Sequence, residues 1–487
     1  MSKYERILGA VGLLATLGMS SAEVLFEPVL DGPLVEHQGS TRGAAWGDLD
    51  GDGDADLYLT HPTYDGPAQR NALYRNDAGI FVPVESAASE LPEAGWEGAT
   101  WVDVDSDGDL DVHVVGRNGA GSAFLENDGA GNLSRRPSDP LSGVVFSASN
   151  ACWADADLDG HLDVFIVGSG EDVNRLFRNH GDWTMEAVAL PALGAGDGGA
   201  RSCVWADLDR DRMPELVIAN ARQPNVLLRN LGGLTFVADT SSSVHEDEAY
   251  SYGISAADVN EDGLQDIFVA NFDAGNSLYL GDSEGGLRQV ELGTTLQSAA
   301  SKGHSWGDFD LDGRVDLYLG SGTPRPGMLN RLYLGLGGGE YELVVEGPYA
   351  SHADTSAAIA SADYDMDGDL DLVVANWGSV GAVDRLYENT VSGRRWLRVR
   401  LEGVRSNRMG VGAHVSVLSS DADGAPTWQH RWLGMSTGYS GQNEPVIHFG
   451  LGTAEVVDSL VVRWPSGVVD RRTAVGPNQT LHVVEGR

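Results

Sequence analysis

One acidic pattern recurs seven times along the chain, and its spacing constrains the fold more than any other feature. Its consensus is Asp-x-Asp-x-Asp-Gly-x-x-Asp, and each copy lies between two short apolar runs. Successive copies start 50 to 55 residues apart, which indicates a repeat architecture rather than a set of unrelated domains. The first acids of the seven copies are Asp48, Asp103, Asp155, Asp207, Asp258, Asp308 and Asp363.

Each repeat is long enough for four short strands. A second apolar motif follows every acidic pattern, as in NALYRN from Asn71 and NRLFRN from Asn174, and a Gly-rich turn with a further apolar run usually comes next. Four short runs separated by turn residues are typical of an antiparallel sheet. Seven such units predict an all-β fold, a seven-bladed β-propeller. A linear solenoid is the competing architecture, but its distinct capping repeats are not seen in the sequence.

The seventh repeat lacks a fourth strand, and the N-terminal segment can supply it. After DRLYEN at Asp384 the chain runs directly into a different sequence, RRWLRVRLEG. Residues 23–32 (EVLFEPVLDG) resemble the fourth-strand run of the first repeat, GIFVPVES. We therefore expect residues 23–32 to pair into the seventh blade of a propeller domain that spans residues 23–391. The alternative is a loose N-terminal arm.

Residues 1–22 have the composition of a secretory signal peptide. Lys3 and Arg6 precede an apolar run over residues 7–19, and small residues lead to a cleavage site after Ala22. The run is too short to cross a bilayer, which needs about 20 apolar residues. We expect a secreted protein, extracellular or periplasmic, without a transmembrane segment. Such compartments supply calcium and permit disulfides.

The charge balance excludes several kinds of partner. The chain has 72 Asp and Glu against 32 Lys and Arg, a formal net charge of −40, which disfavours nucleic acids and anionic membrane surfaces. Because 42% of the residues are hydrophobic, the chain can still build cores, and the acids belong to folded loops.

The two cysteines, Cys152 and Cys203, exclude a disulfide scaffold and a cysteine zinc cluster. They stand just before the Trp of adjacent repeats, but their offsets to the first Asp differ by one residue. Strand alternation then predicts side chains that point apart, and the sequence leaves a disulfide open. We expect the Trp residues that precede the first Asp to pack between blades: Trp46, Trp101, Trp153, Trp205 and Trp306.

The acidic pattern predicts about six calcium sites. A pair of carboxylates about 4 Å apart costs about 4 kcal/mol at an effective dielectric of ~20, and a hard divalent cation removes that repulsion. Calcium accepts six to eight oxygens in flexible geometry, whereas magnesium is stricter and zinc prefers His or Cys. The candidate ligands are Asp48, Asp50, Asp52 and Asp56; Asp103, Asp105, Asp107 and Asp111; Asp155, Asp157, Asp159 and Asp163; Asp258, Asn260, Asp262 and Asp266; Asp308, Asp310, Asp312 and Asp316; and Asp363, Asp365, Asp367 and Asp371.

The fourth repeat departs from the pattern. It keeps Asp207, Asp209 and Asp211, but Arg212 replaces the Gly and Glu215 replaces the last Asp. Because the Arg can neutralise the acids, we expect a weak or empty site there. An acidic, solvated turn is the alternative interpretation of any single copy.

Both parts of the chain resemble known families. The repeats resemble FG-GAP/VCBS repeats, as in integrin α-chain propellers, over residues 23–391. The motifs SNRMGVGAHVSV, GYSGQNEPVIHFGLG and VDSLVVRWPSG make residues 392–487 similar to the ASPIC/UnbV domain. The order of the two parts is that of the cartilage acidic protein-like family. The resemblance implies a secreted, calcium-binding propeller followed by a small C-terminal β domain, and it fixes no molecular activity.

Three functions fit these features. The first is a binding or adhesion module for a protein or glycan at the cell surface or in the matrix, because the loops after the second strands vary while the repeated polar residues are structural. The second is a carbohydrate-active enzyme, a lyase or hydrolase with a site at the propeller channel, although we identify no catalytic residues. The third is a structural matrix component. His245, His304 and His352 are expected in loops, where, with Tyr250 and Tyr252, they line one face of the ring.

Overall fold

The computed structural model describes residues 25–487, apart from short gaps at 37–38, 64–68, 86–90, 137–140, 142–145, 171, 194–198, 292–295, 297–299, 324–328, 349–353, 379–381 and 421–423. The predicted signal peptide and His352 lie outside the described residues. The described part is almost entirely β structure, with one short helix, α1 (Pro33–Glu36), and two 3₁₀ turns, η1 (Pro191–Leu193) and η2 (Ser243–Glu246). Within it, no helix is long and apolar enough to cross a membrane.

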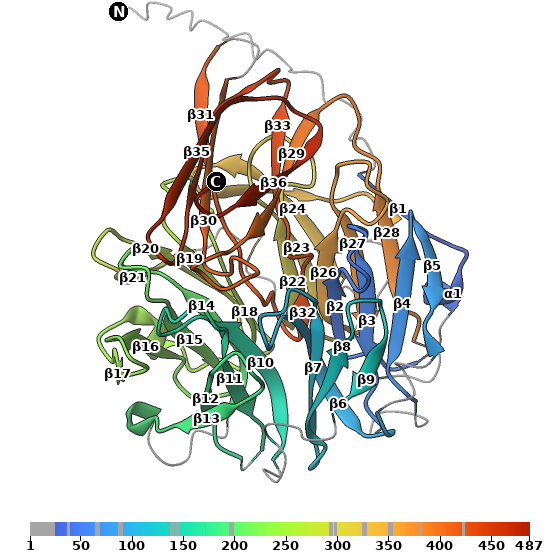
Figure 1. Cartoon of the computed structure of the whole chain (residues 1–487), viewed down its shortest axis with the longest axis vertical. Coiled ribbons are helices and arrows are strands. Elements are labelled where there is room, and N and C mark those ends of the chain that lie inside the picture. Colours follow the sequence, from blue (N-terminus) through green and yellow to red (C-terminus); the bar gives the residue numbers. More distant parts are fainter. Residues whose placement is uncertain are drawn as a thin grey trace, which may run out of the picture.

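Seven antiparallel sheets form a propeller, as the repeats predict, and each sheet is one blade (Figure 1). Blades 1 to 3 contain β2 (Gly43–Gly47), β3 (Asp56–Thr60), β4 (Ala72–Asp77) and β5 (Ile80–Pro83); β6 (Gly95–Val102), β7 (Asp111–Arg117), β8 (Gly121–Asn127) and β9 (Leu133–Arg135); and β10 (Ala148–Ala154), β11 (Asp163–Gly168), β12 (Arg175–Asn179) and β13 (Met185–Val188).

Blades 4 to 6 repeat the same order of strands. They contain β14 (Ala200–Ala206), β15 (Glu215–Asn220), β16 (Val226–Asn230) and β17 (Phe236–Ala238); β18 (Ser251–Ala257), β19 (Asp266–Asn271), β20 (Ser277–Gly281) and β21 (Leu287–Val290); and β22 (Ser301–Gly307), β23 (Asp316–Ser321), β24 (Arg331–Gly337) and β25 (Glu340–Val344).

Blade 7 joins the two ends of the propeller sequence. It contains β26 (Ser356–Ala362), β27 (Asp371–Asn376) and β28 (Arg385–Asn389), and its outer strand is β1 (Phe26–Pro28). The strands β1 and β28 are antiparallel, with Phe26 opposite Asn389, and the Phe26 ring is fully buried 5.5 Å from that of Phe309. The ring is thus closed by a strand from the other end of the chain.

Apolar cores fill the spaces between neighbouring blades, and the repeated Trp residues lie there as predicted. The indole Nε1 of Trp101 donates to the carbonyl of Ala45 at 3.0 Å, and that of Trp205 donates to the carbonyl of Cys152 at 3.1 Å. These two Trp residues therefore fix their inner strands to the inner strand of the preceding blade, whereas Trp153 Nε1 donates to His113 on the second strand of blade 2 at 3.2 Å.

Cys152 in β10 and Cys203 in β14 form a disulfide, with their Cα atoms 6.1 Å apart. The prediction that their side chains point apart is wrong. Two neighbouring blades meet through opposite faces of their equivalent strands. Because successive side chains of a strand point to opposite faces, two side chains that meet between blades stand at repeat positions that differ by one residue. The bridge lies with Phe165 and Leu216 in the core between blades 3 and 4.

One of the histidines expected in loops lies in a strand instead. His304 is not in a loop, because it lies in β22, where it is fully buried and its Nε2 is 2.6 Å from the hydroxyl of Ser255.

The C-terminal part forms two small sheets on one end of the ring (Figure 1). Strand β29 lies between β33 and β36, and the second sheet has the order β31-β30-β34-β35. Their shared core includes Leu397, Phe449 and Trp464. The strands are β29 (Arg395–Glu402), β30 (His414–Ser420), β31 (Pro426–Trp432), β32 (Gly441–Gln442), β33 (Ile447–Gly452), β34 (Val457–Arg463), β35 (Val469–Val475) and β36 (Gln479–Val484).

Residues 437–444 of this C-terminal part enter the central channel of the propeller, and we call them the plug. Within the plug, β32 pairs in parallel with β2, the inner strand of blade 1. The side chain of Gln442 bonds both backbone groups of Trp101, at 2.7 Å and 3.0 Å, as a neighbouring strand would.

The plug contacts all seven inner strands. Besides blades 1 and 2, it hydrogen-bonds residues of the inner strands of blades 3 to 7, namely Ser149, Ser202, Ile254, His304 and Ser361. Gly438 and Gly441 suit this place, because a Cβ at either position would lie within 2.6 Å of the backbone of an inner strand.

Candidate metal centres

The loop between the first and second strands of each blade carries the predicted ligands, and we call it the acidic loop. In blade 2, Asp103 Oδ2 accepts the N–H of Gly108 at 3.1 Å, and Asp107 Oδ1 accepts the N–H of Asp109 at 3.0 Å. Ser106 and Gly108 adopt positive φ values of 63° and 105°. The backbone folds tightly, and its acids gather on the inside of the turn.

The last acid of each pattern has a structural task that the sequence did not reveal. In blade 3, Asp163 Oδ2 accepts the N–H of Ala156 at 3.1 Å, while its Oδ1 accepts the N–H of Asn179 on the third strand at 3.0 Å. The equivalent two bonds occur in all seven blades, with Glu215 serving in blade 4. This acid joins the acidic loop to the third strand.

The Asn that ends many second motifs links neighbouring blades. Asn179 Nδ2 donates to the carbonyl of Val104 in blade 2 at 2.8 Å, and Asn127 Nδ2 donates to the carbonyl of Leu49 in blade 1 at 2.8 Å. The acceptor is in each case the residue after the first acid of the preceding blade. The repeated final Asn in the sequence was the available signal for this link.

After these bonds, buried carboxylate oxygens remain without a hydrogen-bond partner. Asp103 Oδ1 and Asp105 Oδ1 are two of them in blade 2. A buried charged oxygen is costly unless it is paired, so these oxygens fit a hard cation. The others at first and third positions are on Asp48, Asp50, Asp155, Asp157, Asp207, Asp308 and Asp363, of which Asp48 Oδ2 and Asp363 Oδ2 lie within 3.1 Å of an arginine.

The structure brings three acids of a loop together in at least five blades. Their ligand oxygens lie within 4.8 Å of one another in each group. The groups are Asp48, Asp50 and Asp56; Asp103, Asp105 and Asp107; Asp155, Asp157 and Asp159; Asp207, Asp209 and Glu215; and Asp308, Asp310 and Asp316.

Blades 4 and 5 differ from the others. In blade 4 the acids gather although Arg212 replaces Gly at a φ of 81°, and the Arg side chain donates to the carbonyl of Pro465 in the C-terminal domain at 3.4 Å. In blade 5 both oxygens of Asp258 accept backbone N–H groups, and Asn260 Nδ2 donates to Asp262 at 3.0 Å. The blade 5 loop therefore supplies hydrogen-bond donors to its own side-chain oxygens more completely than the other loops do.

Burial raises the pKa of the gathered acids. The pKa of Asp103 and of Asp155 rises to about 7, mainly through desolvation and then through the neighbouring carboxylates. Desolvation likewise raises the pKa of Asp163 to about 8 and that of Asp369, an acid outside the predicted set, to about 9. Carboxylates that are difficult to ionise alone ionise readily beside a cation.

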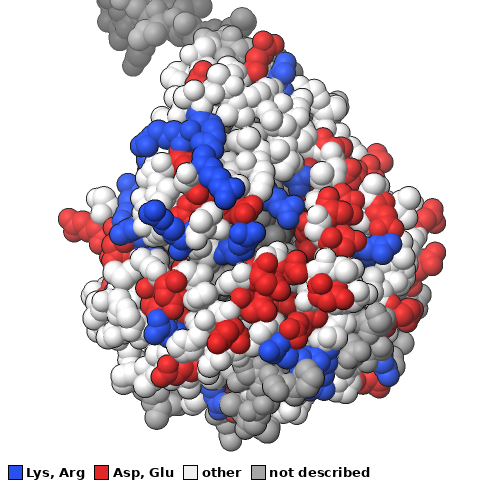
Figure 2. All heavy atoms as spheres, viewed as in Figure 1, with Lys and Arg blue, Asp and Glu red and all other residues white. Residues whose placement is uncertain are grey.

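The C-terminal domain lies over the acidic loops and brings arginines to three of them. Residues 392–487 have 11 Arg against 8 Asp and Glu, a net charge of +3, which leaves −43 for residues 1–391. Figure 2 shows basic side chains gathered toward the C-terminal domain and a band of acidic ones on the propeller beneath it. The pairs are Arg400 with Asp48 at 3.0 Å, Arg398 with Asp363 at 3.1 Å, and Arg394 with Asp310 at 3.0 Å.

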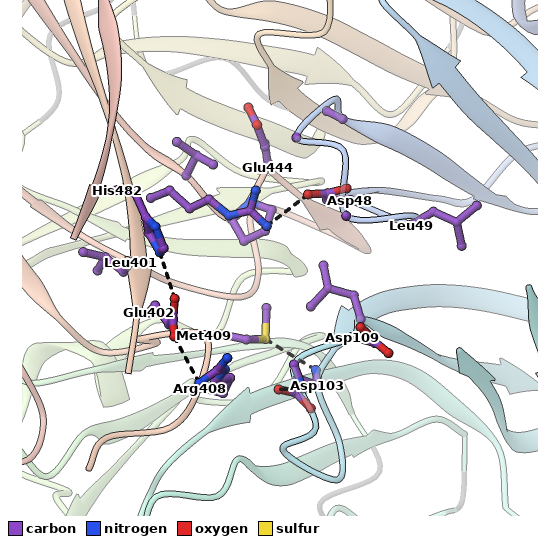
Figure 3. A pocket seen from close by; sticks show the side chains of 18 of the residues that line it. Asp48, Leu49, Asp103, Asp109, Leu401, Glu402, Arg408, Met409, Glu444 and His482 are labelled. Carbon is purple, nitrogen blue, oxygen red and sulfur yellow. Dashed lines mark hydrogen bonds and ion pairs between the residues drawn. The ribbon is translucent and has the colours of Figure 1, made fainter. Parts of the chain in front are cut away.

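A cavity of about 470 Å³ separates the C-terminal domain from the acidic loops of blades 1 and 2 (Figure 3). Asp48 and Asp103 line it from the propeller side. From the other side, Glu402 bridges Arg408 at 3.1 Å and His482 at 3.0 Å.

The arginines that pair with the acidic loops were only partly predictable. Arg398 and Arg400 are two positions apart on β29, so strand alternation could have placed them on one face. Nothing in the sequence showed that this face meets the loops.

Family comparisons agree with this arrangement of a repeat ring and a terminal domain. The FG-GAP-like repeat matches six overlapping segments, at residues 48–114, 103–166, 155–218, 207–269, 258–319 and 308–374. The chain therefore belongs to the FG-GAP-like repeat family. Residues 403–487 match the family described as ASPIC and UnbV.

Curated relatives are similar to this protein over most of the chain. Cartilage acidic protein 1 of Homo sapiens is 26% identical over 97% of this chain and 77% of its own length. Cartilage acidic protein 1 of Xenopus tropicalis is 26% identical over 90% of this chain and 63% of its own length.

Solved structures are similar at a lower level. YCF48 bound to D1 peptide has 13% identity and a TM-score of 0.45, over 76% of this chain and 99% of that one. Saccharomyces cerevisiae Sqt1 has 11% identity and a TM-score of 0.47, over 73% of this chain and 98% of that one.

Proposed function

We propose that this protein is a secreted, calcium-binding propeller that binds a protein or glycan at the cell surface or in the extracellular matrix. The observation that carries the calcium part is the set of buried carboxylate oxygens without hydrogen-bond partners, which recurs at equivalent positions around the ring. Their number and hardness suit calcium. In this proposal the predicted Asp and Asn ligands of blades 1, 2, 3, 5, 6 and 7 hold calcium, and the blade 4 loop holds it weakly.

Two features support export. The disulfide between Cys152 and Cys203 suits an oxidising compartment. Residues 1–22 have a signal-peptide composition, and in the proposal they are removed, leaving a propeller of residues 23–391 and a C-terminal domain of residues 392–487.

The plug bears on the enzymatic alternative. A lyase or hydrolase with its site inside the channel needs space there for substrate, but residues 437–444 contact all seven inner strands. Every repeated polar group described above has a structural or cation-binding task. A rigid ring that recognises its ligand at the end opposite the C-terminal domain accounts for both observations.

Calcium titration of the purified protein by calorimetry tests the proposal. We expect several sites, and we expect Asp103→Asn with Asp105→Asn to remove one of them. Glu186→Gln is the matched control, because Glu186 is exposed and lies outside the acidic loops. Capture of matrix or cell-surface ligands in calcium, and its loss in EGTA, tests the binding role. No heat of binding with calcium would contradict the metal assignment.

A further inference from the structure

The end of the channel opposite the C-terminal domain gathers cations, although the protein as a whole is strongly acidic. They stand where first strands begin or second strands end in blades 1, 2, 4 and 6, so the ring places them around its axis. These cations are Arg42, Arg117, Arg201, Arg222 and Lys302.

Aromatic rings lie among these cations. The Lys302 ammonium is 4.0 Å from the ring centre of Trp377 and 4.7 Å from that of Tyr252. The Arg42 guanidinium is 3.7 Å from the same Trp377 ring. Trp377, Tyr252 and Phe272 are all half-buried, so part of each ring faces solvent. We call the cations and these rings, together with Tyr250, the mouth cluster.

Blades 4 and 5 provide the most exposed part of the mouth cluster. Arg201 Nη2 donates to the hydroxyl of Tyr250 at 3.1 Å, and the Arg222 guanidinium is 5.2 Å from the Tyr250 ring centre. The side chain of Arg222 is 74% exposed. The rings of Tyr250 and Tyr252 are 5.0 Å apart.

The tip of the plug forms the base of the mouth cluster. Tyr439 is fully buried, and its ring lies edge-on to that of Tyr252 at 5.3 Å. The Tyr439 hydroxyl donates to Glu97 at 2.9 Å and accepts from Arg117 at 3.2 Å. Contacts therefore join residues of several blades to the C-terminal domain, and the site is held rigid before any ligand arrives.

The charges of the mouth cluster favour an anion. Glu97 is 3.5 Å from Arg117, and Asp273 is 3.6 Å from Arg222, whereas Arg201 donates to the Tyr250 hydroxyl, so these three arginines and two acids sum to +1. Although burial raises it, hydrogen bonds from Tyr252 and Arg201 bring the pKa of Tyr250 below its ordinary value. Cations held side by side repel one another, and an anionic ligand relieves that repulsion.

We propose that the mouth cluster is the binding site for an acidic saccharide, such as a uronate-containing chain. Arg222, which is exposed, and Arg201, which is half-buried, pair with the carboxylates of the sugar. The buried Arg42 and Lys302 act only through the positive potential that they create, and the half-buried rings stack on the apolar C–H faces of the pyranose units. An acidic peptide would use the cations but leave the aromatic surface without a partner. This inference names the ligand of the proposed binding role and rests on that role.

Calorimetry with the calcium-loaded, full-length mature protein tests the inference. The probes are an oligogalacturonate, a neutral oligosaccharide of equal length and a poly-glutamate peptide of equal charge. We expect binding of the oligogalacturonate alone, with an affinity that falls as salt rises. Arg222→Ala should weaken it about tenfold, and so should Tyr250→Ala, while melting temperatures should change little because both residues are partly exposed.

The matched control is Arg75→Ala, because Arg75 is an exposed, ion-paired Arg on β4 away from the mouth cluster, and its affinity should equal that of the wild type. Equal loss in Arg75→Ala, or no loss in the two mouth variants, would overturn the assignment of the site. Equal binding of poly-glutamate would overturn the saccharide assignment. If the protein captures a cell-surface protein in calcium but no acidic saccharide, this inference fails while the broader binding role stands.

Discussion

Removal of calcium with excess EGTA is expected to lower the melting temperature by about 10 °C. Outside the degenerate blade 4, five acidic loops, in blades 1, 2, 3, 6 and 7, have a first-position carboxylate with a buried oxygen that lacks a hydrogen-bond partner; in blade 7 that oxygen lies 3.1 Å from Arg398. The blade 5 loop is left out because both oxygens of Asp258 accept backbone N–H groups. At a calcium concentration ten times Kd, each site stabilises the folded state by about 1.4 kcal/mol, so five sites contribute about 7 kcal/mol. A domain of this size loses roughly 1–2 °C of melting temperature per kcal/mol.

Differential scanning fluorimetry at pH 7.5, in calcium and in EGTA, measures this shift. Asp103→Asn with Asp155→Asn removes a ligand from two of the five loops, so the calcium-dependent part of the shift should fall by about two-fifths. Because each variant is compared with itself in EGTA, any effect on the calcium-free fold cancels. Glu186→Gln should retain the full shift. A melting curve that EGTA leaves unchanged, or that magnesium raises as much as calcium, would refute the reasoning.

Three further predictions concern pH, the disulfide and the plug. Burial raises the pKa of Asp163 to about 8 from an ordinary value near 4, so between these values the folded, calcium-free protein binds more protons than the unfolded chain. The stability of the calcium-free protein should therefore fall as pH rises toward 8. The melting temperature in EGTA should be lower at pH 8 than at pH 5.5. Calcium should remove this dependence. Replacement of Cys152 and Cys203 by Ser should cost about 4 kcal/mol, measured by urea denaturation, because the bridge closes a loop of 51 residues. Gln442→Ala should cost about 2–4 kcal/mol in the same assay, since it leaves both backbone groups of Trp101 without partners, and a cost below 1 kcal/mol would contradict the role of the plug.

The propeller could be predicted because its information is local and repeated. Each acidic loop, each final Asn and each Trp before the first Asp occupies a fixed place in the repeat, so seven copies give the number of blades. The strand β1 could also be anticipated, because a blade that lacks its outer strand needs one from elsewhere. The metal ligands remain a prediction, supported by the way the structure gathers their oxygens.

The features that could not be predicted depend on contacts between distant parts of the chain. Residues 437–444 (TGYSGQNE) have the polar composition of an exposed loop, and only the ring gives their polar groups partners. The sequence left the disulfide open, because strand alternation within one sheet does not describe how two blades face each other. The pairing of Arg398 with Asp363 likewise depends on how two domains dock, which no local pattern specifies.

The plug also sets the order in which the molecule can be completed. Residues 437–444 leave the ribosome after the residues of all seven blades have been made. Until then the polar backbone of seven inner strands surrounds an unfilled axis, so a chain that is cut short before this segment keeps an unfinished centre however well its blades have formed. The centre of the ring is therefore completed by a segment that is synthesised after the blades that surround it.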